Sequence, residues 1–421
     1  MPVLRFAVLG GSSVATPELC RALLDWPGGA HMRPEMHLVL LGRSPSRLEQ
    51  VQAICARMLA GTSIEVTATT DWPRGLAGAD VILNQMRVGG LQARAFDETF
   101  PHAFNLPGEE TIGPGGFANA LRTIPVVLHA MHIIEQVAPE AQVLNLTNPA
   151  GIVQHAVTRY TSVRMLSLCD SPITLGEEIA RLLTLPRADL EIDYLGMNHL
   201  GWALAVRRRQ DDLMELALAR VGNVEHLGTD VDYVQATRAI PLPYVRYYLH
   251  PERMLAQQRG RSPRAHQLQA LEEELWQAYT LDLSEAEGRQ AGASVARRGA
   301  LWYQAIVVPV LETLWLNKGR TWVVNVTNGQ LVPWLPQETI VEVPARIEKR
   351  GIYPLPVPAH LLAPDLRMLL TALATYEELA VPAIVEKNYS LALQALVAHP
   401  LIPSLDSARR VLDAVWPTGG I

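Results

Sequence analysis

Residues 5–19, which read RFAVLGGSSVATPEL, decide the fold. The first five of them form a short apolar run that predicts a buried strand. Thr16 followed by Pro17 predicts the start of a helix, with threonine as the N-cap and proline in the first turn. The segment is therefore a strand–turn–helix unit of the kind that builds parallel α/β sheets.

Strands and helices continue to alternate through the first half of the chain. Four more apolar runs predict buried strands, at residues 37–41, 64–69, 81–83 and 142–146. Apolar residues at helical spacing predict helices, at residues 47–59 and 116–137. Because such alternation forms right-handed βαβ units, we predict an α/β fold with a doubly wound, Rossmann-type parallel sheet of the lactate/malate dehydrogenase type.

The turn between the first strand and the first helix suits a dinucleotide. Gly10 and Gly11 would let the backbone approach a pyrophosphate at the helix N-terminus, and Ser12 and Ser13 complete the turn. The pattern is incomplete, because Ser12 stands where a glycine would allow the closest approach. Arg43 follows the second strand, where an acidic residue would accept from a ribose 2′-hydroxyl; it either accommodates a 2′-phosphate or is solvated. We expect NAD rather than NADP.

The second half of the chain has a different pattern. It is mostly helical from residue 205 to 300, and a strand pair is then predicted at 321–326 and 338–343. A chain of 421 residues is also long for a single core. We therefore predict two domains that share a cleft: an NAD-binding domain at 1–200 and a mixed, mainly helical domain for substrate binding and oligomerisation at 201–421.

Composition excludes several classes of partner. The chain is 49% hydrophobic and 19% charged, as in ordered globular proteins, and its net charge of −6 gives no support for nucleic acid or an anionic membrane surface. No apolar run looks long enough to span a bilayer, and no signal peptide is expected. The three cysteines predict no disulfide framework and fit a reducing cytoplasm.

A thiol and an imidazole follow two further apolar runs. Cys169 comes after the run at 164–168, and His199 comes after the run at 190–197, with Asn198 between. Ligands bind outside the carboxyl ends of strands in open α/β sheets, so these two side chains could hold one divalent metal there. The alternative is a buried free cysteine and a hydrogen-bonded histidine.

Other predicted strand ends also carry polar residues. Residues 84–90 follow a strand and precede Arg94, residues 109–116 form a Gly/Pro-rich loop, and residues 145–149 end another strand. One such cluster would be ordinary turn chemistry. Five clusters on one sheet edge, counting those at the thiol and the imidazole, indicate a site for a polyhydroxyl ligand beside the cofactor.

Together these motifs resemble the NAD- and divalent-metal-dependent glycoside hydrolases of family 4, and among them the 6-phospho-β-glucosidases. The signatures are Arg87–Gly90, Glu110–Thr111, Gly113–Gly116, Thr147–Gly151, Asn198–Trp202 and Pro243–Tyr248. The resemblance extends over nearly the whole chain. It implies a glycosidase that hydrolyses 6-phospho-β-glucosides or phosphorylated disaccharides and that forms a homodimer or homotetramer.

The resemblance also implies that the sugar is oxidised before its bond breaks. NAD⁺ takes a hydride from C3, a base removes the acidified C2 proton, and the aglycone leaves C1 by elimination; water then adds and NADH returns the hydride. Cys169 and His199 match the metal ligands, with Mn²⁺ as the usual ion. Tyr244 matches the base, provided that a cation lowers its pKa. From the residues alone, Tyr244 suits an aromatic helix face equally well.

Further residues are assigned to the substrate by the same resemblance. Glu110, Asn148 and Asn198 are expected to face the sugar. Arg94 and Arg264 match residues that hold the 6-phosphate, because a planar guanidinium binds phosphate oxygens bidentately.

Asp170 leaves the anomer open. An aspartate here resembles the α-specific members, in which it protonates the leaving group; otherwise it caps a helix or supports the metal. The alternatives are therefore an α-specific or non-phosphorylated glycosidase of the same family, a hydroxy-acid dehydrogenase, or an inactive NAD-binding protein.

Overall fold

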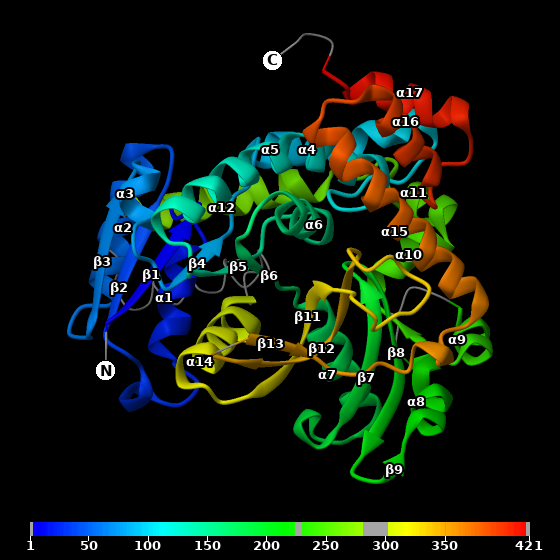
Figure 1. Cartoon of the computed structure of the whole chain (residues 1–421), viewed down its shortest axis with the longest axis horizontal. Coiled ribbons are helices and arrows are strands. Elements are labelled where there is room, and N and C mark those ends of the chain that lie inside the picture. The colour runs from blue at the N-terminus through cyan, green and yellow to red at the C-terminus, as the bar shows by residue number, and fades with distance from the viewer. Residues whose placement is uncertain (1–2, 224–229, 281–301, 350, 418–421) are drawn as a thin grey trace.

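The computed structural model describes residues 3–223, 230–280, 302–349 and 351–417. Residues 281–301, most of which are predicted to be helical, lie outside the described residues. Two sheets organise the described chain. The first half forms a parallel sheet, and an antiparallel sheet lies beside it, with long helices packed over both (Figure 1).

Six parallel strands form the first sheet in the order β3-β2-β1-β4-β5-β6. They are β1 (Leu4–Leu9), β2 (Met36–Leu41), β3 (Ile64–Thr69), β4 (Val81–Asn84), β5 (Gln142–Asn145) and β6 (Arg164–Ser167). The order reverses between β1 and β4, and ligands bind at such a switch point. The predicted doubly wound sheet is confirmed.

Helices connect these strands and cover the sheet. They are α1 (Thr16–Leu24), α2 (Pro45–Met58), α3 (Trp72–Leu76), α4 (Gly90–Thr99), α5 (Gly113–Val137), α6 (Ala150–Tyr160) and α7 (Ser171–Leu183). Val8, Leu40 and Leu83 are fully buried, as expected for strands that are covered on both faces.

The second sheet is antiparallel, with the order β10-β8-β7-β12-β11. Its strands are β7 (Glu191–Met197), β8 (Leu200–Arg208), β9 (Asp211–Asp212), β10 (Ile240–Pro241), β11 (Arg320–Thr327), β12 (Ile340–Glu348) and β13 (Gly351–Pro354). The run at 190–197 was predicted to end at the edge of the parallel sheet, which is wrong, because β7 pairs with β8 in an antiparallel hairpin. Apolar content alone does not reveal a strand's pairing partner. The domain boundary at residue 200 stays a prediction.

The remaining helices surround the second sheet and return to the first. They are α8 (Met214–Arg220), α9 (Val231–Thr237), α10 (Arg246–Leu249), α11 (Pro251–Gln258), α12 (Arg264–Thr280), α14 (Val308–Leu316), α15 (Pro364–Val385), α16 (Tyr389–Ala398) and α17 (Leu405–Val415). A π-helix (Tyr303–Val307) leads into α14. In Figure 1, α12 passes behind α5, and α15 runs from α16 toward α9.

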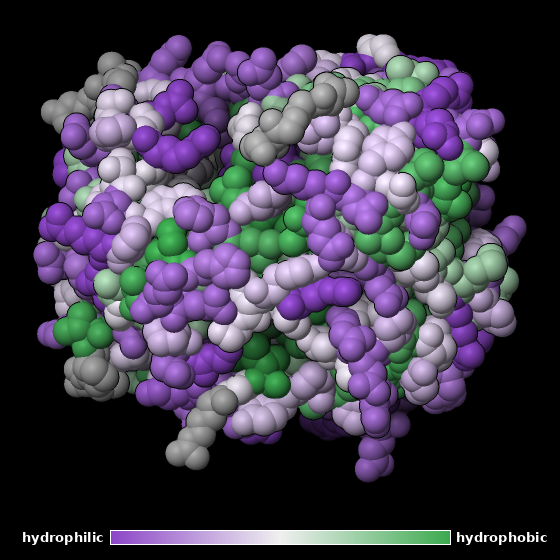
Figure 2. All heavy atoms as spheres, turned by 45° about the horizontal axis from the view of Figure 1, so that its top comes forward, coloured by the Kyte–Doolittle hydropathy of each residue, from purple (hydrophilic) through white to green (hydrophobic). Residues whose placement is uncertain are grey.

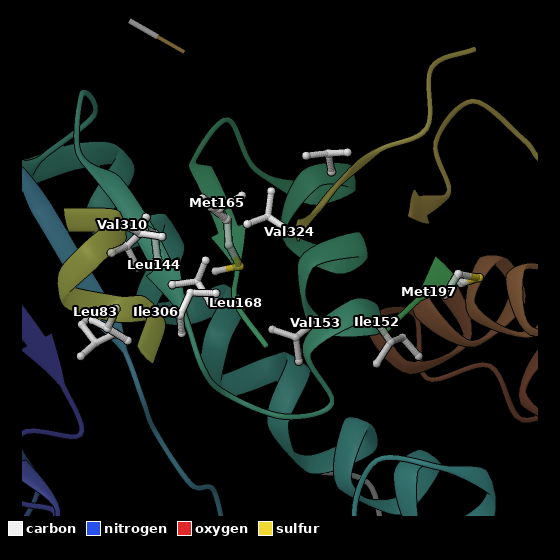
Figure 3. Packing of buried hydrophobic residues seen from close by; sticks show 14 of the residues in the cluster. Leu83, Leu144, Ile152, Val153, Met165, Leu168, Met197, Ile306, Val310 and Val324 are labelled. Carbon is white, nitrogen blue, oxygen red and sulfur yellow. The ribbon is translucent and has the colours of Figure 1, made fainter. Parts of the chain in front are cut away.

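Apolar and polar contacts join the two sheets. Leu83 and Leu144 of the parallel sheet lie beside Ile306 and Val310 of the π-helix and α14 (Figure 3). The Asn325 side-chain amide of β11 also donates to the Ser167 carbonyl of β6, at 3.1 Å. The two layers therefore form one continuous core.

Two helices correct the expectation that no segment could span a bilayer. By length and composition, α5 and α15 are long and apolar enough to do so among the described residues. However, 61% and 56% of their apolar windows are buried inside the fold, as in core helices. The face shown in Figure 2 carries its hydrophobic side chains in separate patches between hydrophilic ones. Packing in the core therefore explains the apolar composition of these two helices.

Candidate active site

The predicted dinucleotide turn packs tightly onto the end of β2. Gly10 has φ +84°, a conformation that favours glycine. A Cβ on Gly11 would lie 2.9 Å from the Leu40 Cα, so only glycine fits without a shift. A Cβ on Gly42 would lie 2.8 Å from the Ser12 Oγ. The Ser12 hydroxyl thus lies against the end of β2 instead of leaving the turn open.

Gln85 and two tyrosines from the second half of the chain hold this turn. Gln85 donates its side-chain N–H to the Gly10 carbonyl at 3.3 Å, and the Tyr303 hydroxyl donates to the Gln85 Oε1 at 2.6 Å. The Tyr279 hydroxyl donates to the Val14 carbonyl at 3.0 Å. No sequence motif indicated the two tyrosine contacts, because they join residues more than 200 positions apart.

A cavity of about 630 Å³ opens at the carboxyl edge of the parallel sheet. Every predicted site residue except Gly11 lines it: Gly10, Ser12, Ser13, Arg43, Arg94, Glu110, Asn148, Cys169, Asp170, Asn198, His199, Tyr244 and Arg264. Gly11 lies directly beneath, where it packs on β2. The structure therefore brings the predicted cofactor, metal and substrate residues into one space.

Cys169 and His199 enter the cavity from different sheets. Cys169 follows β6, and His199, with Asn198, forms the two-residue turn between β7 and β8. His199 has φ +65°, which is uncommon for a residue other than glycine and is often found at functional sites. A hairpin of the second sheet thus presents the imidazole to the end of a strand in the first.

A hydrogen-bond chain fixes the orientation of the His199 ring. The Thr111 hydroxyl donates to the Glu109 carboxylate, and the Thr111 Oγ1 lies 2.7 Å from the His199 Nδ1. Because that hydroxyl proton is directed to Glu109, the oxygen accepts from an Nδ1–H. The Nε2 then carries the lone pair, as in histidines that bind metal through one nitrogen while the other is hydrogen-bonded.

The donor set fits a divalent metal. Burial lowers the pKa of His199 to about 4, which keeps the imidazole neutral and able to ligate. Burial, Glu342 and Asp170 raise the pKa of the Cys169 thiol, so binding of a metal there would release its proton. No group of three or more His, Cys, Asp or Glu side chains that could hold a metal occurs in the described part of the chain. The coordination positions of the metal that Cys169 and His199 do not fill would be left to substrate or water.

Tyr244 lies flat against His199. The two ring centroids are 3.8 Å apart, with an angle of 4° between the planes. Burial, followed by the nearby Glu109 carboxylate, raises the pKa of Tyr244. The described side chains therefore do not lower the pKa of Tyr244, although its role as the base requires a lower pKa. A metal held by the neighbouring His199 and Cys169 would provide the positive charge.

Two arginines hold Glu110 at the edge of the cavity. Arg87 contacts one carboxylate oxygen, and Arg94 contacts the other at 2.8 Å. Burial alone would raise the pKa of Glu110, but Arg87 and Arg94 outweigh it and the pKa is lowered. Arg94 also pairs with Glu98 at 2.6 Å, so two carboxylates already engage its guanidinium.

A second hollow adjoins the first and is rich in arginine. Arg94 and Arg264 line both hollows, and Arg246 and Arg261 line only the second. Arg264 is exposed at the start of α12 and donates to Gln267 at 3.0 Å. The predicted pair, Arg94 and Arg264, therefore lies where the two hollows meet, and Arg246 and Arg261 add positive charge to the second hollow.

Asp170 occupies the N-cap position of α7 without capping it. Its side chain accepts no capping hydrogen bond within the described structure, and it lines the cavity instead. Burial raises the pKa of its carboxyl group. The alternative role of an ordinary helix cap is thus wrong, and a proton donor remains compatible.

The residue that supports Asn198 is not among the predicted site residues. Glu342 of β12 is fully buried and accepts from the Tyr194 hydroxyl at 2.7 Å and from the Asn198 amide at 3.4 Å. Burial raises the pKa of Glu342 to about 7. A carboxylate inside the apolar run Val341-Glu342-Val343 was the available signal.

Fold and site together define a dinucleotide-binding enzyme with a thiol–imidazole metal site. Family models then specify the class: the family 4 glycosyl hydrolase model matches residues 5–185, and the model of its C-terminal domain matches residues 194–402. The chain belongs to the family 4 glycosyl hydrolases, as the motifs indicated.

Individual relatives carry phosphoglucosidase names of both anomeric types. The chain is 31% identical to a probable 6-phospho-β-glucosidase of Bacillus subtilis, over 97% of this chain and 95% of the relative. A 6-phospho-β-glucosidase structure from Thermotoga maritima, with manganese, NAD⁺ and glucose-6-phosphate, has a TM-score of 0.88 at 26% identity and covers 98% of this chain and 97% of its own.

A 6-phospho-α-glucosidase structure from gut microorganisms, with NAD and Mn²⁺, has a TM-score of 0.85 at 25% identity and covers 98% of this chain and 97% of its own. A lactate dehydrogenase of Eimeria maxima, at 13% identity and a TM-score of 0.52, shares the fold alone. NAD and Mn²⁺, the cofactors predicted from the sequence, are confirmed as those held in these family structures.

Proposed function

We propose that the protein is an NAD- and divalent-metal-dependent glycosidase that hydrolyses 6-phospho-β-glucosides. One observation carries the proposal: Cys169, His199 and Tyr244 line one cavity together with Gly10 and Ser13 of the dinucleotide turn. A metal ion, a sugar and a nicotinamide would meet in that space. The similarity to 6-phospho-β-glucosidases supports the β anomer.

In this proposal each residue acts on a stated atom. Cys169 and His199 would hold the metal, and Gly10, Ser12 and Ser13 would hold the dinucleotide phosphates. When bound, the dinucleotide supplies a hydride acceptor and the metal supplies a Lewis acid for the sugar oxygens. Tyr244, stacked on His199, would take the proton from C2 on its phenolate oxygen, once a metal held by the neighbouring residues has lowered its pKa.

Other residues hold the sugar and its phosphate. Glu110, Asn148 and Asn198 line the cavity from three loops, and they would face the sugar hydroxyls. We assign the 6-phosphate to Arg94 and Arg264, which lie where the two hollows meet.

A second candidate is the α-specific activity, and Asp170 favours it. Its carboxyl group lines the cavity, caps no helix, and has a raised pKa that keeps it protonated to higher pH. A protonated carboxyl group could donate to the glycosidic oxygen. The similar α-glucosidase structure gives this candidate independent support.

We also propose a cytoplasmic protein that forms a homodimer or homotetramer. The buried Cys169 thiol can ligate a metal only where it stays reduced, and all three cysteines are free. We keep the division into an NAD-binding domain at 1–200 and a substrate domain at 201–421.

The test is release of p-nitrophenol from the 6-phospho-β-glucoside, from its α-anomer and from the unphosphorylated β-glucoside. Each is assayed with and without NAD⁺, and with Mn²⁺ or EDTA, under reducing conditions. We expect turnover of the 6-phospho-β-glucoside that requires both NAD⁺ and Mn²⁺. Faster turnover of the 6-phospho-α-glucoside would favour the second candidate. Net accumulation of NADH would indicate a dehydrogenase, and binding of NAD⁺ without turnover would indicate an inactive binding protein.

A further inference from the structure

The connection from β2 to α2 gives the cofactor cavity a positive end. Arg43, Ser44 and Arg47 line the cavity beside Ser12 of the dinucleotide turn. In dinucleotide-binding folds the adenosine ribose lies at this strand end. The carboxylates that line the cavity come from other elements: Glu109, Glu110, Asp170 and Glu272. A ribose 2′-hydroxyl therefore lacks its usual carboxylate acceptor at this strand end.

The two arginines are placed to bind an anion. Arg43 is exposed, and no hydrogen bond or ion pair engages its guanidinium in the described part of the chain. The Arg47 guanidinium lies over the Trp276 ring, 5.4 Å from the ring centroid. Trp276 lines the same cavity, so this contact keeps Arg47 at the cavity edge.

The start of α2 adds hydrogen-bond donors of the same kind. Ser44 is the N-cap of this 14-residue helix, but its side chain makes no capping hydrogen bond. The first-turn N–H groups of a helix have no intrahelical acceptor and lie at its positive end. The hydroxyls of Ser44 and Ser46, 3.4 Å apart, lie at the same helix start. Arginine, serine and free amide donors together suit a phosphate monoester.

We infer that this pocket binds the 2′-phosphate of an adenine dinucleotide, so that the protein binds NADP⁺ more tightly than NAD⁺. The inference rests on the proposed function only in using the same cofactor site. It revises the expectation of NAD over NADP for this chain, and it leaves the chemistry at the nicotinamide unchanged.

The test compares binding of NADP⁺ and NAD⁺ to the full chain by isothermal titration calorimetry. The wild type is expected to bind NADP⁺ at least tenfold more tightly. Arg43→Asp should weaken NADP⁺ at least 100-fold, because a carboxylate repels the 2′-phosphate, and should leave NAD⁺ unchanged or tighter, because it accepts from the 2′-hydroxyl. Arg57→Ala is the control, since Arg57 lies in the last turn of the same helix and does not line the cavity. It should change neither affinity.

Equal or weaker binding of NADP⁺ by the wild type would overturn the inference, as would equal losses for both dinucleotides in Arg43→Asp. Turnover of the p-nitrophenyl 6-phosphoglucosides, measured with each dinucleotide, separates this result from the proposed function. Hydrolysis supported by NAD⁺ and not by NADP⁺ would overturn the inference of a 2′-phosphate pocket, but it would agree with the proposed glycosidase function. Binding of either dinucleotide without any hydrolysis would overturn the glycosidase and leave the binding comparison intact.

Discussion

At the scale of single residues, Thr111 sets which nitrogen of His199 faces the cavity. Replacing it by valine removes the oxygen that accepts from the Nδ1 and leaves that buried polar group without a partner. We expect Thr111→Val to weaken Mn²⁺ binding about 10- to 100-fold, the usual effect of losing such a supporting hydrogen bond. Electron paramagnetic resonance of free Mn²⁺ measures this without turnover.

Thr111→Ser keeps the hydroxyl and should restore most of the affinity. Thr371→Val, an exposed threonine of α15, is the unrelated control. If Thr111→Val binds Mn²⁺ as tightly as the wild type, the hydrogen-bond chain does not orient the ligand.

Sequence motifs identified the residues that line the site better than the residues that hydrogen-bond to them. Cys169, His199 and Tyr244 carry recognisable flanking residues, and the structure gathers them as expected. Thr111 lies 88 positions from the imidazole it contacts, and Glu342 lies 144 positions from Asn198. Hydrogen bonds across such separations depend on tertiary packing, which a single sequence does not contain.

At the scale of elements, the turn from β1 to α1 depends on its close approach to β2. The Gly11 amide donates to the Leu41 carbonyl at 2.7 Å, and an added Cβ would meet the Leu40 backbone. We expect Gly11→Ala to lower the free energy of unfolding by about 1–3 kcal/mol, the range for overpacking, and to weaken dinucleotide binding at least tenfold.

Urea unfolding and calorimetric titration measure the two effects of Gly11→Ala. Gly222→Ala is the matched control, because a Cβ there would meet only Val231, at 3.7 Å or beyond. Wild-type affinity in Gly11→Ala would show that the turn tolerates displacement from β2.

The helix α15 carries a buried carboxyl group against α6. A Cβ on Gly151 would lie 3.1 Å from the Glu377 Oε1, and the Oε2 finds no hydrogen-bond partner in the described structure. Burial raises the pKa of Glu377 from 4.5 to about 8. Between these values the folded chain holds a proton that the unfolded chain releases, so the free energy of unfolding falls as pH rises, by up to about 1.4 kcal/mol per pH unit.

Glu377→Gln removes this titration. We expect a shallower loss of stability from pH 5 to 8 than in the wild type, measured as the urea midpoint at each pH. The exposed neighbour Glu378, changed to glutamine, should leave the wild-type slope unaltered. Parallel slopes for the wild type and Glu377→Gln would contradict the assignment.

The elements themselves were predictable where apolar periodicity decides them. The strand at 64–69 and the helix ending at Val137 match their predicted positions. The run at 190–197 was correctly expected to be a strand but was placed in the wrong sheet. A buried strand has the same apolar pattern in a parallel sheet as in an antiparallel one. Its pairing with β8 comes from a two-residue turn that was interpreted as a functional cluster.

At the scale of the whole molecule, the site exists only because two sheets meet. Cys169 comes from the parallel sheet and His199 from the antiparallel one, and Asn325 ties the layers together beside them. The change of pattern near residue 200 predicted a shared cleft, but it did not predict which strand would supply the imidazole. The cofactor turn likewise depends on Tyr279 and Tyr303 from the second half.

A metal that bridges the two sheets should stabilise the whole chain. At 100 times its dissociation constant, a ligand that binds only the folded state adds about 2.7 kcal/mol. With an unfolding entropy of about 2.1 cal/mol/K per residue, this raises the Tm by about 3 °C for a chain of 421 residues. Scanning calorimetry with Mn²⁺ and with EDTA measures the shift. Cys169→Ser should lose both the shift and all turnover while keeping its circular dichroism spectrum, whereas Cys55→Ala should keep both. An equal shift in Cys169→Ser would place the stabilising metal elsewhere.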